Sequence, residues 1–186
     1  MTNRDEQNPR FSRIFDANFE AIRAYCLRRL PEQDAYDASS EVFLVAWRRI
    51  DAVPEGDEAR LWLYGVARNT VRTFDRTNRR VTRLRTRLNG HAAATAIASP
   101  EAQVVAGLEY QRIMTCFDRL SENDQEVLRL RLWEELSVPE IAVVFDCSKK
   151  AASKRYQRAL ARLDRRVAAS DSRSVIRGQV SRGGAL

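Results

Sequence analysis

The helical spacing of its apolar residues constrains the fold of this chain more than any other feature. Within residues 11–30, one face collects Phe15, Phe19, Ile22, Cys26 and Leu30, which is the period of an amphipathic helix. The same period recurs along most of the chain, and the alternating β-branched runs typical of strands are absent. We therefore predict an all-α fold. The indicated helices cover residues 11–30, 34–50, from 58 onward, 100–120, 121–133, 137–145 and 148–166.

Composition divides these helices between two small domains. Residues 88–99 read LNGHAAATAIAS, a small and neutral stretch, and Ser99-Pro100-Glu101 is typical of a helix start. After residue 168 the apolar period ends, as in chain ends that stay flexible. We predict a first domain over 1–88, a flexible linker over 89–99, a second domain over 100–168 and a flexible tail over 169–186.

Basic residues are concentrated in two segments. Residues 68–87 hold eight Arg and one acidic residue, and residues 148–166 hold eight Lys or Arg and one acidic residue. Each segment therefore carries +7, which equals the net charge of the whole chain, so the remaining residues together carry −7. A mildly acidic body with two cationic helices indicates a polyanionic partner.

Several classes of protein are excluded by what the sequence lacks. It has no run of eighteen apolar residues and starts MTNRDEQNPR, so we expect no membrane insertion, no signal peptide and a cytoplasmic location. Three separated cysteines and one histidine, His91, make neither a disulfide framework nor a zinc site. Phosphate-loop, nucleophile-elbow and metalloprotease motifs are also absent. We expect no cofactor, no metal and no enzymatic activity.

The second cationic segment follows a helix-turn-helix pattern. Ser137 and Glu140 have capping-box spacing, and Asp146 and Cys147 suit a turn before Ser148, the expected N-cap of a longer helix. Such a helix enters the major groove of DNA. The alternative is a solvated cationic face on an ordinary bundle helix; the capped turn favours DNA binding. We expect Ala152, Tyr156, Ala159, Leu160 and Leu163 to face inward. We expect an outward DNA-facing set of Lys150, Ser153, Lys154, Gln157 and Arg158.

The first cationic segment places arginines at helical spacing beside an apolar stripe. Arginine neutralises phosphates and stacks on exposed bases, and Asn69 among them can hydrogen-bond a base. Trp62 and Tyr64 are candidate stacking platforms for unpaired bases, with plain core as the alternative for Trp62. Trp47 is expected in the core.

An acidic stripe marks the helix predicted over 34–50. Asp34, Asp37 and Glu41 lie about one turn apart on the face away from Phe43 and Trp47. Because this face repels DNA, it suits solvent or a basic protein partner. Without a nearby nucleophile or metal ligand, it does not support acid–base catalysis.

Two stretches of the sequence resemble one family. DASSEVFLVAW, a short loop and ARLWLYGVARNTVRTFDRTNRR are similar to region two of extracytoplasmic-function (ECF) sigma factors, small sigma-70-type initiation subunits of bacterial RNA polymerase. LSENDQEVLRLRLWEELSVPEIAVVFDCSKKAASKRYQRALARL is similar to their region four. The resemblance covers about residues 11–168, with both signatures in the family's order.

The resemblance implies a role for each feature. It implies docking on the polymerase β′ coiled coil through the surface of Asp34, Asp37, Ser40 and Glu41. It implies that the loop over 53–60, with Trp62, captures an unpaired base of the minus-ten promoter element. The same element is held by Asn69, Arg72, Arg76, Arg79 and Arg80. The duplex minus-thirty-five element is read by Lys150, Ser153, Lys154, Gln157 and Arg158. Residues 126–133 belong to a scaffold that docks on the β flap, the linker passes near the RNA exit path, and an anti-sigma factor is a usual partner.

The sequence departs from the family pattern at three places. Ser40 stands where glutamine is usual, Lys150-Ala151-Ala152 stands where Gly-Thr-Val is usual, and Ser121 stands where proline is usual. The second departure adds charge to the recognition helix and trims its inward stripe. All elements of the architecture are retained.

Two other functions compete with a promoter-specificity subunit. A stand-alone helix-turn-helix transcriptional regulator explains the second cationic segment but gives no role to residues 68–87 or to the acidic stripe. An RNA-binding protein uses both cationic segments on phosphates but does not need the capped turn over 137–148.

Overall fold

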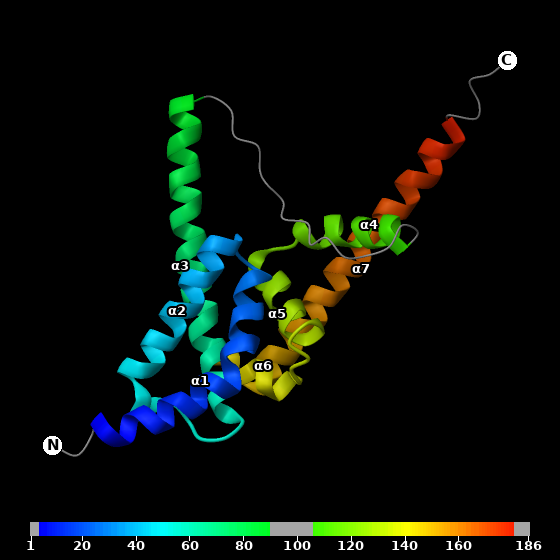
Figure 1. Ribbon diagram of the computed structural model, residues 1–186. Helices are drawn as coiled ribbons and strands as arrows, with labels where there is room; N and C mark the ends of the chain where they lie inside the picture. Colours follow the sequence, from blue (N-terminus) through cyan, green and yellow to red (C-terminus); the bar gives the residue numbers. More distant parts are fainter. Residues whose placement is uncertain (1–3, 90–105, 181–186) are drawn as a thin grey trace. The chain divides into compact units, whose positions relative to one another are not determined.

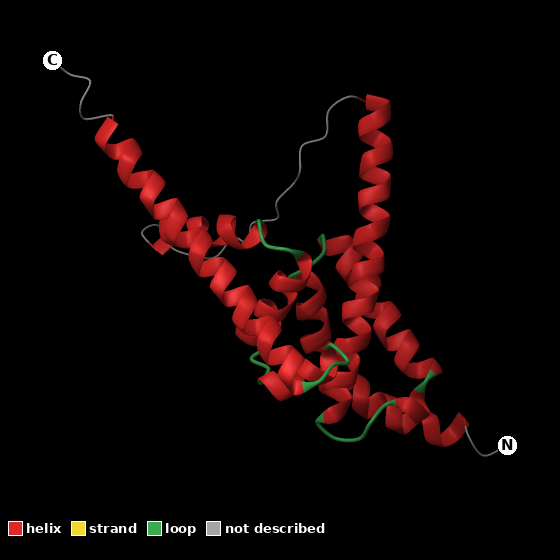
Figure 2. Ribbon diagram, turned by 180° about the vertical axis from the view of Figure 1, so that it is seen from behind, coloured by secondary structure: helices red, strands yellow, loops and turns green. Residues whose placement is uncertain are grey.

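The computed structural model describes the backbone of residues 4–89 and 106–180 (Figure 1). All regular structure in these two ranges is helical, which confirms the predicted all-α class (Figure 2). The helices are α1 (Arg4–Leu27), α2 (Glu32–Arg48), α3 (Glu58–Asn89), α4 (Ala106–Asp118), α5 (Glu122–Leu132), α6 (Val138–Val144) and α7 (Lys149–Val180), with a 3₁₀ turn at Ile50–Ala52.

The chain forms two compact units, residues 1–98 with 143–146 and residues 99–142 with 147–186. Helices α1, α2 and α3 build the first, and α4, α5 and α7 belong to the second. The predicted linker lies outside the described residues except for Asn89, which ends α3. His91 and the predicted helix start at Ser99 also lie outside them.

The first unit is a three-helix arrangement in which each helix contacts the other two. The predicted apolar stripes supply its core. Fully or almost fully buried side chains are Ile22 and Cys26 on α1, Val42, Phe43 and Ala46 on α2, and Leu63 and Ala67 on α3. This burial, rather than local helix propensity, supplies most of the stability of such helices.

A cluster of aromatic rings joins α1 to α2 at one side of this core. The Phe15 ring lies 4.9 Å from Phe19 and 4.7 Å from Phe43, measured between centroids. At the end of this cluster the Trp47 ring meets Phe11 edge-on at 5.1 Å. Trp47 remains 38% exposed, so the prediction of a core position is wrong: α1 covers only one side of the indole.

In the second unit, α7 packs against α5 and α4. Helix α5 contributes the buried residues Val127, Leu128 and Leu130, and α7 contributes Ala152 and Ala159. Phe117 at the end of α4 is buried and meets Trp133 edge-on at 5.6 Å between ring centroids. The α7 stripe is narrower than predicted, because Leu160 is 38% exposed.

Helix α7 is longer than the sequence indicated. We predicted its end near Arg166, but the helix continues to Val180, so residues 169–180 of the predicted tail are helical. No glycine or proline occurs between Arg166 and Gly178. An established helix gains one hydrogen bond for each residue it adds, so helical structure can continue without an apolar stripe. Residues 181–186 lie outside the described part of the chain.

None of the described helices combines the length and the apolar character needed to cross a membrane. Within the same residues, no three metal-ligating side chains gather into a group that could hold an ion.

Candidate nucleic-acid interfaces

The start of α6 is set by the predicted capping box. The backbone N–H of Ser137 donates to the Glu140 carboxylate at 2.7 Å, and the Ser137 hydroxyl oxygen accepts from the Glu140 N–H at 3.5 Å. Both bonds satisfy backbone donors that the first helical turn leaves open. The capping-box prediction is confirmed.

A tight turn connects α6 to α7. Asp146 adopts a left-handed conformation with φ of 48°, and the N–H of Cys147 donates to the Ala142 carbonyl at 2.9 Å. This closing bond is typical of a helix end with a left-handed residue. The Ser148 hydroxyl then accepts from the Ala151 N–H at 3.2 Å, which confirms Ser148 as the cap of α7.

The outward side of α7 carries the predicted DNA-facing set. Lys150, Lys154, Gln157 and Arg158 are exposed and Ser153 is half-buried, while Ala152 and Ala159 are buried. The four exposed side chains make no hydrogen bond or ion pair with any described residue. Their charges and hydrogen-bonding groups are therefore available to a ligand.

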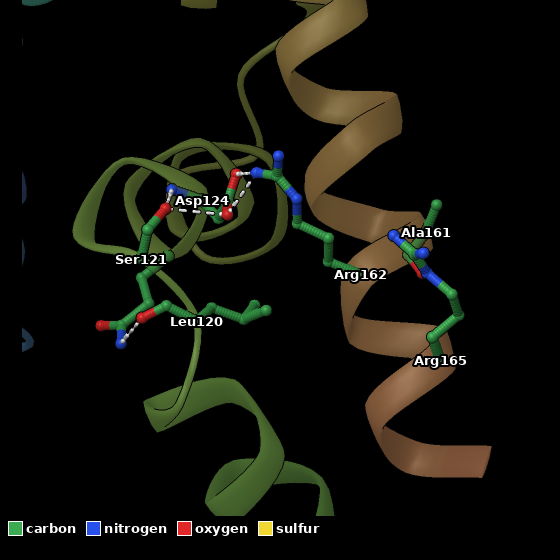
Figure 3. A network of polar contacts seen from close by, with 7 residues as sticks. Leu120, Ser121, Asp124, Ala161, Arg162 and Arg165 are labelled. Atoms are coloured by element: carbon green, nitrogen blue, oxygen red, sulfur yellow. Dashed lines mark hydrogen bonds and ion pairs between the residues drawn. The ribbon is translucent and has the colours of Figure 1, made fainter. Parts of the chain in front are cut away.

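One cation of α7 is already paired. Arg162 donates from Nη1 to both carboxylate oxygens of Asp124, at 2.8 and 2.7 Å (Figure 3). Asp124 in turn accepts from the Ser121 hydroxyl at 2.8 Å, and its N–H donates to the Ser121 oxygen at 3.2 Å. The local spacing of Ser121 and Asp124 predicted the cap of α5. The partner on α7 was missed, because it lies 38 residues further along the chain.

Helix α3 presents the first candidate interface. Asn69, Arg72 and Arg76 are exposed, whereas Ala67 and Val71 are buried. The hydroxyls of Thr73 and Thr77 donate to backbone carbonyls one turn earlier, at 3.1 Å each. Arg79 and Arg80 continue the same helix, and their side chains lie outside the described part.

The two aromatic candidates on α3 differ. Trp62 is half-buried, so part of its ring is accessible. Tyr64 is 4% exposed and its ring lies 5.4 Å from that of Tyr25. The prediction that Tyr64 is a stacking platform for bases is wrong, because its ring already packs inside the core.

The loop before α3 borders a cavity. The volume is about 530 Å³. The loop turns at Gly56, where φ is +63°, and Arg10 of α1 donates to the Val53 carbonyl at 2.6 Å. The lining residues come from this loop and from α1, including Arg10, Arg13, Asn18, Glu55, Asp57 and Arg60. The contribution of α1 was missed, since no sequence motif links residues 10–18 to the loop.

Helix α2 carries the predicted acidic stripe. Asp37 and Ser40 are exposed, and Asp34 and Glu41 are half-buried. The Ser40 hydroxyl donates to the Tyr36 carbonyl of its own helix at 3.0 Å. The same helix also exposes large apolar side chains. They are Tyr36, Leu44 and Trp47, each about two-fifths exposed.

Comparisons with known proteins give matches over both candidate interfaces. The family model described as Sigma-70 region 2 matches residues 14–81, and the one described as Sigma-70, region 4 matches residues 110–163. The RNA polymerase sigma factor NccH of Alcaligenes xylosoxydans xylosoxydans is 31% identical over 140 residues, covering 72% of this chain and 73% of the relative. The sigma factor CnrH of Cupriavidus metallidurans is 32% identical over 141 residues, with 72% and 73% coverage.

Solved structures share the fold. The sigma factor RpoE in complex with the anti-sigma factor NepR, from Bartonella quintana, aligns with a TM-score of 0.61 and 19% identity, over 84% of this chain and 96% of that one. CnrH in complex with the cytosolic domain of CnrY aligns with a TM-score of 0.53 and 24% identity, over 90% and 91%.

The acidic stripe of α2 and the exposed side of α3 therefore lie within region 2, and the helix-turn-helix lies within region 4, of one class of protein, the sigma-70 initiation factors. The chain belongs to this family and is an RNA polymerase sigma factor of the ECF group. It acts with core RNA polymerase and promoter DNA. The stand-alone regulator is not favoured, because it leaves the region 2 match unexplained.

Proposed function

We propose that the two described surfaces divide promoter recognition between them. The exposed side of α7, with Lys150, Lys154, Gln157 and Arg158, reads the duplex minus-thirty-five element, and half-buried Ser153 adds a hydroxyl. The strongest support is that the four exposed side chains lack partners in the described residues and follow a capped turn. The first residues of such a helix reach base edges, and later cations contact phosphates.

The minus-ten element is held by α3. Asn69 offers an amide to a base edge, while Arg72 and Arg76 neutralise phosphates of the separated strand. Arg79 and Arg80 follow on the same helix, and the proposal includes them from the sequence alone. Trp62 stacks on a base through its accessible part.

The loop over 53–60 captures an unpaired base of the same element. The cavity beside this loop supports the role, because Arg13 of α1 and Arg60 of α3 line it together with Glu55 and Asp57 of the loop. Arg13 and Arg60 attract the phosphates of the captured nucleotide. The Arg10 bond to Val53 holds the loop against α1.

Core polymerase docks on α2. Asp34, Asp37, Ser40 and Glu41 meet a basic surface of the β′ coiled coil, and the exposed Leu44 and Trp47 add apolar contact. Residues 126–133 lie in the scaffold that meets the β flap. Trp133 and Leu132 are exposed there. The protein acts in the cytoplasm with its polymerase, without a catalytic activity or cofactor of its own.

An anti-sigma factor regulates the protein. The support is that two proteins with this fold were solved in complexes: RpoE with the anti-sigma factor NepR, and CnrH with the cytosolic domain of CnrY. The partner covers surfaces that polymerase needs. Purification of the tagged chain from its own cells, with polymerase and other captured proteins identified by mass spectrometry, tests this.

Run-off transcription tests the proposed function. Core polymerase, the purified chain and the promoter of its own operon are expected to give a transcript that core polymerase alone does not give. Absence of a transcript, together with absence of co-purifying polymerase, contradicts the proposal.

Charge removal on α7 tests the assignment of the upstream element. Lys154→Ala with Arg158→Ala is expected to weaken binding of polymerase holoenzyme to the minus-thirty-five element while core-polymerase affinity stays unchanged. Because each of the two cations neutralises a phosphate, their removal lowers the slope of log affinity against log salt by about two. Equal loss of polymerase binding would show that these side chains support the fold instead.

A further inference from the structure

The α5–α7 interface positions the recognition helix, and the fully buried side chains that α7 brings to it are small. On α7 the buried residues are the alanines at 152 and 159, two helical turns apart, facing an α5 core of Val127, Leu128 and Leu130. Alanine allows close approach of helices but offers little shape for interdigitation. Apolar contact is also non-directional. The two alanines alone therefore do not strongly fix the rotation of α7 or its displacement along its axis, and the larger Tyr156 and Leu163 on the same helix are only half-buried.

A directional contact joins the same two helices. The Arg162 guanidinium contacts both Asp124 oxygens, at 2.8 and 2.7 Å, and the remaining side of the carboxylate accepts from Ser121 (Figure 3). Both contacts come from the single nitrogen Nη1, so these charged hydrogen bonds hold Nη1 between the two carboxylate oxygens at a short distance from each. Asp124 is 8% exposed and sits in the first turn of α5. It is therefore a fixed anchor rather than a mobile surface group.

We propose that the Asp124–Arg162 pair sets the register of the recognition helix, and that Arg162 is a positioning residue for reading the minus-thirty-five element. This inference rests on the proposed DNA-facing role of residues 150–158. Arg162 lies one turn beyond Arg158 and two turns beyond Lys154 on the same helix. A small rotation of α7 at Arg162 therefore moves the base-reading side chains out of alignment with the groove.

The pair also removes one cation from the set that meets phosphate. Arg162 belongs to the +7 segment of the sequence, and by charge alone it would be counted as a DNA contact. In the structure its charge is compensated by a buried carboxylate. Withdrawing the guanidinium toward a phosphate leaves Asp124 buried without its partner, which is strongly unfavourable.

Stability alone does not require an ion pair here. Only the Asp124 end of the pair is buried, because the Arg162 side chain is 49% exposed. Even fully buried ion pairs can often be replaced by apolar residues of similar size with equal or greater stability, and the best-attested use of such pairs is to specify register. The contribution of the pair to stability can therefore be separated from its effect on register by a variant that packs as well but makes no directional bond. Asp124→Leu with Arg162→Met is that variant.

The experiment uses full-length variants assembled with core polymerase on the promoter of the run-off assay. The measured quantity is discrimination, the ratio of holoenzyme affinities for the native promoter and for one with a scrambled minus-thirty-five element. For Asp124→Leu with Arg162→Met we expect Tm within a few degrees of wild type, an unchanged salt slope and discrimination about tenfold lower, comparable to one mismatched base pair. Arg162→Lys keeps the charge and gives a further test should the double variant fold poorly. It is expected to lower discrimination as well, because the lysine ammonium is a point charge on a flexible stem and lacks the planar guanidinium that fixes the direction of the contact.

Arg165→Met is the matched control. Arg165 is an exposed arginine on the same helix, just beyond Arg162, and it donates to the Ala161 carbonyl of its own helix at 3.1 Å. This variant is expected to keep the discrimination of the wild type.

Two results overturn the inference. Full discrimination in both Asp124→Leu/Arg162→Met and Arg162→Lys means that the pair contributes only stability. A salt slope reduced by about one in the double variant, with discrimination kept, means that Arg162 contacts phosphate. Lys154→Ala with Arg158→Ala is measured in parallel to distinguish failure of this inference from failure of the proposed function. If that variant also leaves discrimination unchanged, the proposed DNA-facing role of residues 150–158 is wrong.

Discussion

At the scale of single residues, burial changes the chemistry of Cys26 most. Its side chain on α1 is fully buried, and this burial raises the pKa of the thiol from 9.0 to about 11, against a smaller lowering effect of Arg29. The thiolate is the reactive form of cysteine. Cys26 is therefore an inert core residue, as its place in the apolar stripe of residues 15–30 predicted.

The raised pKa makes stability depend on pH in the alkaline range. Between about pH 9 and pH 11 the unfolded chain loses the Cys26 proton while the folded chain keeps it. The unfolded state then binds fewer protons, so the free energy of unfolding falls as pH rises. We expect this loss to exceed that of Cys26→Ala by at most about 3 kcal/mol between pH 9 and 11. Urea titrations of both proteins at each pH give the free energy of unfolding. If that free energy changes with pH equally in both proteins, the prediction is contradicted.

Gly56 has a left-handed backbone conformation in the loop that is proposed to capture a base. Its φ is +63°, and a Cβ built at this position meets no atom within 4 Å. Any destabilisation in Gly56→Ala therefore comes from the left-handed conformation rather than from a clash. We expect the free energy of unfolding to fall by about 1 kcal/mol, measured by urea denaturation.

Gly107 provides the matched control for this loop glycine. It lies in α4, has no positive φ, and a Cβ there also meets nothing within 4 Å. Gly107→Ala is expected to leave the free energy of unfolding unchanged or raise it by up to about 1 kcal/mol. Equal effects of the two substitutions would show that φ does not decide the outcome.

The residues that sequence reasoning misplaced share one cause. Periodicity predicts which side of a helix is apolar, but not how much of that side a neighbour covers. Trp47 and Leu160 lie on apolar stripes and are each 38% exposed, whereas Tyr64 is almost fully enclosed beside Tyr25. These differences depend on packing between helices, which local spacing does not contain.

At the scale of elements, helix starts were predictable and some helix ends were not. Ser121, Ser137 and Ser148 each cap a helix where the sequence placed a cap. A cap is a contact within three residues, so its signal is local. The end of α7 has no comparable signal, and the helix runs past the predicted residue 166 to Val180.

Substitution measures how much each cap of the helix-turn-helix contributes to the free energy of unfolding. Ser137→Ala and Ser148→Ala each leave backbone donors of a first helical turn without an acceptor. Each is expected to lower the free energy of unfolding by about 1 kcal/mol, measured by urea denaturation. Ser12→Ala is the control, since that hydroxyl lies within α1 and contacts only Asp16 on the exposed surface, at 3.3 Å. Its effect should stay within about 0.5 kcal/mol.

At the scale of the whole molecule, the sequence predicted the two regions and the candidate DNA-facing residues, because both rest on local motifs and charge. It did not predict contacts between distant positions. Arg10 meets the loop carbonyl of Val53, 43 residues away, and Arg162 meets Asp124. Such pairs depend on which helices lie together, so a single sequence does not indicate them, although each one positions a candidate site.

The proposed division of promoter recognition between two regions has a consequence for the free chain. Each region offers a small cationic surface, and two weak contacts reinforce each other only when both are held at the spacing of the promoter elements. In the proposed function, polymerase supplies that spacing by docking both regions. We therefore expect the isolated chain to bind its promoter at least about a hundredfold more weakly than the holoenzyme does, the lower end of the gain from linked sites.

Fluorescence anisotropy with a labelled promoter fragment, with and without core polymerase at fixed salt, measures the ratio of the two affinities. Core polymerase alone and a fragment with both elements scrambled are the controls. Tight, sequence-specific binding by the isolated chain would mean that its two surfaces are already correctly spaced, and that docking on polymerase does not create the promoter-binding state.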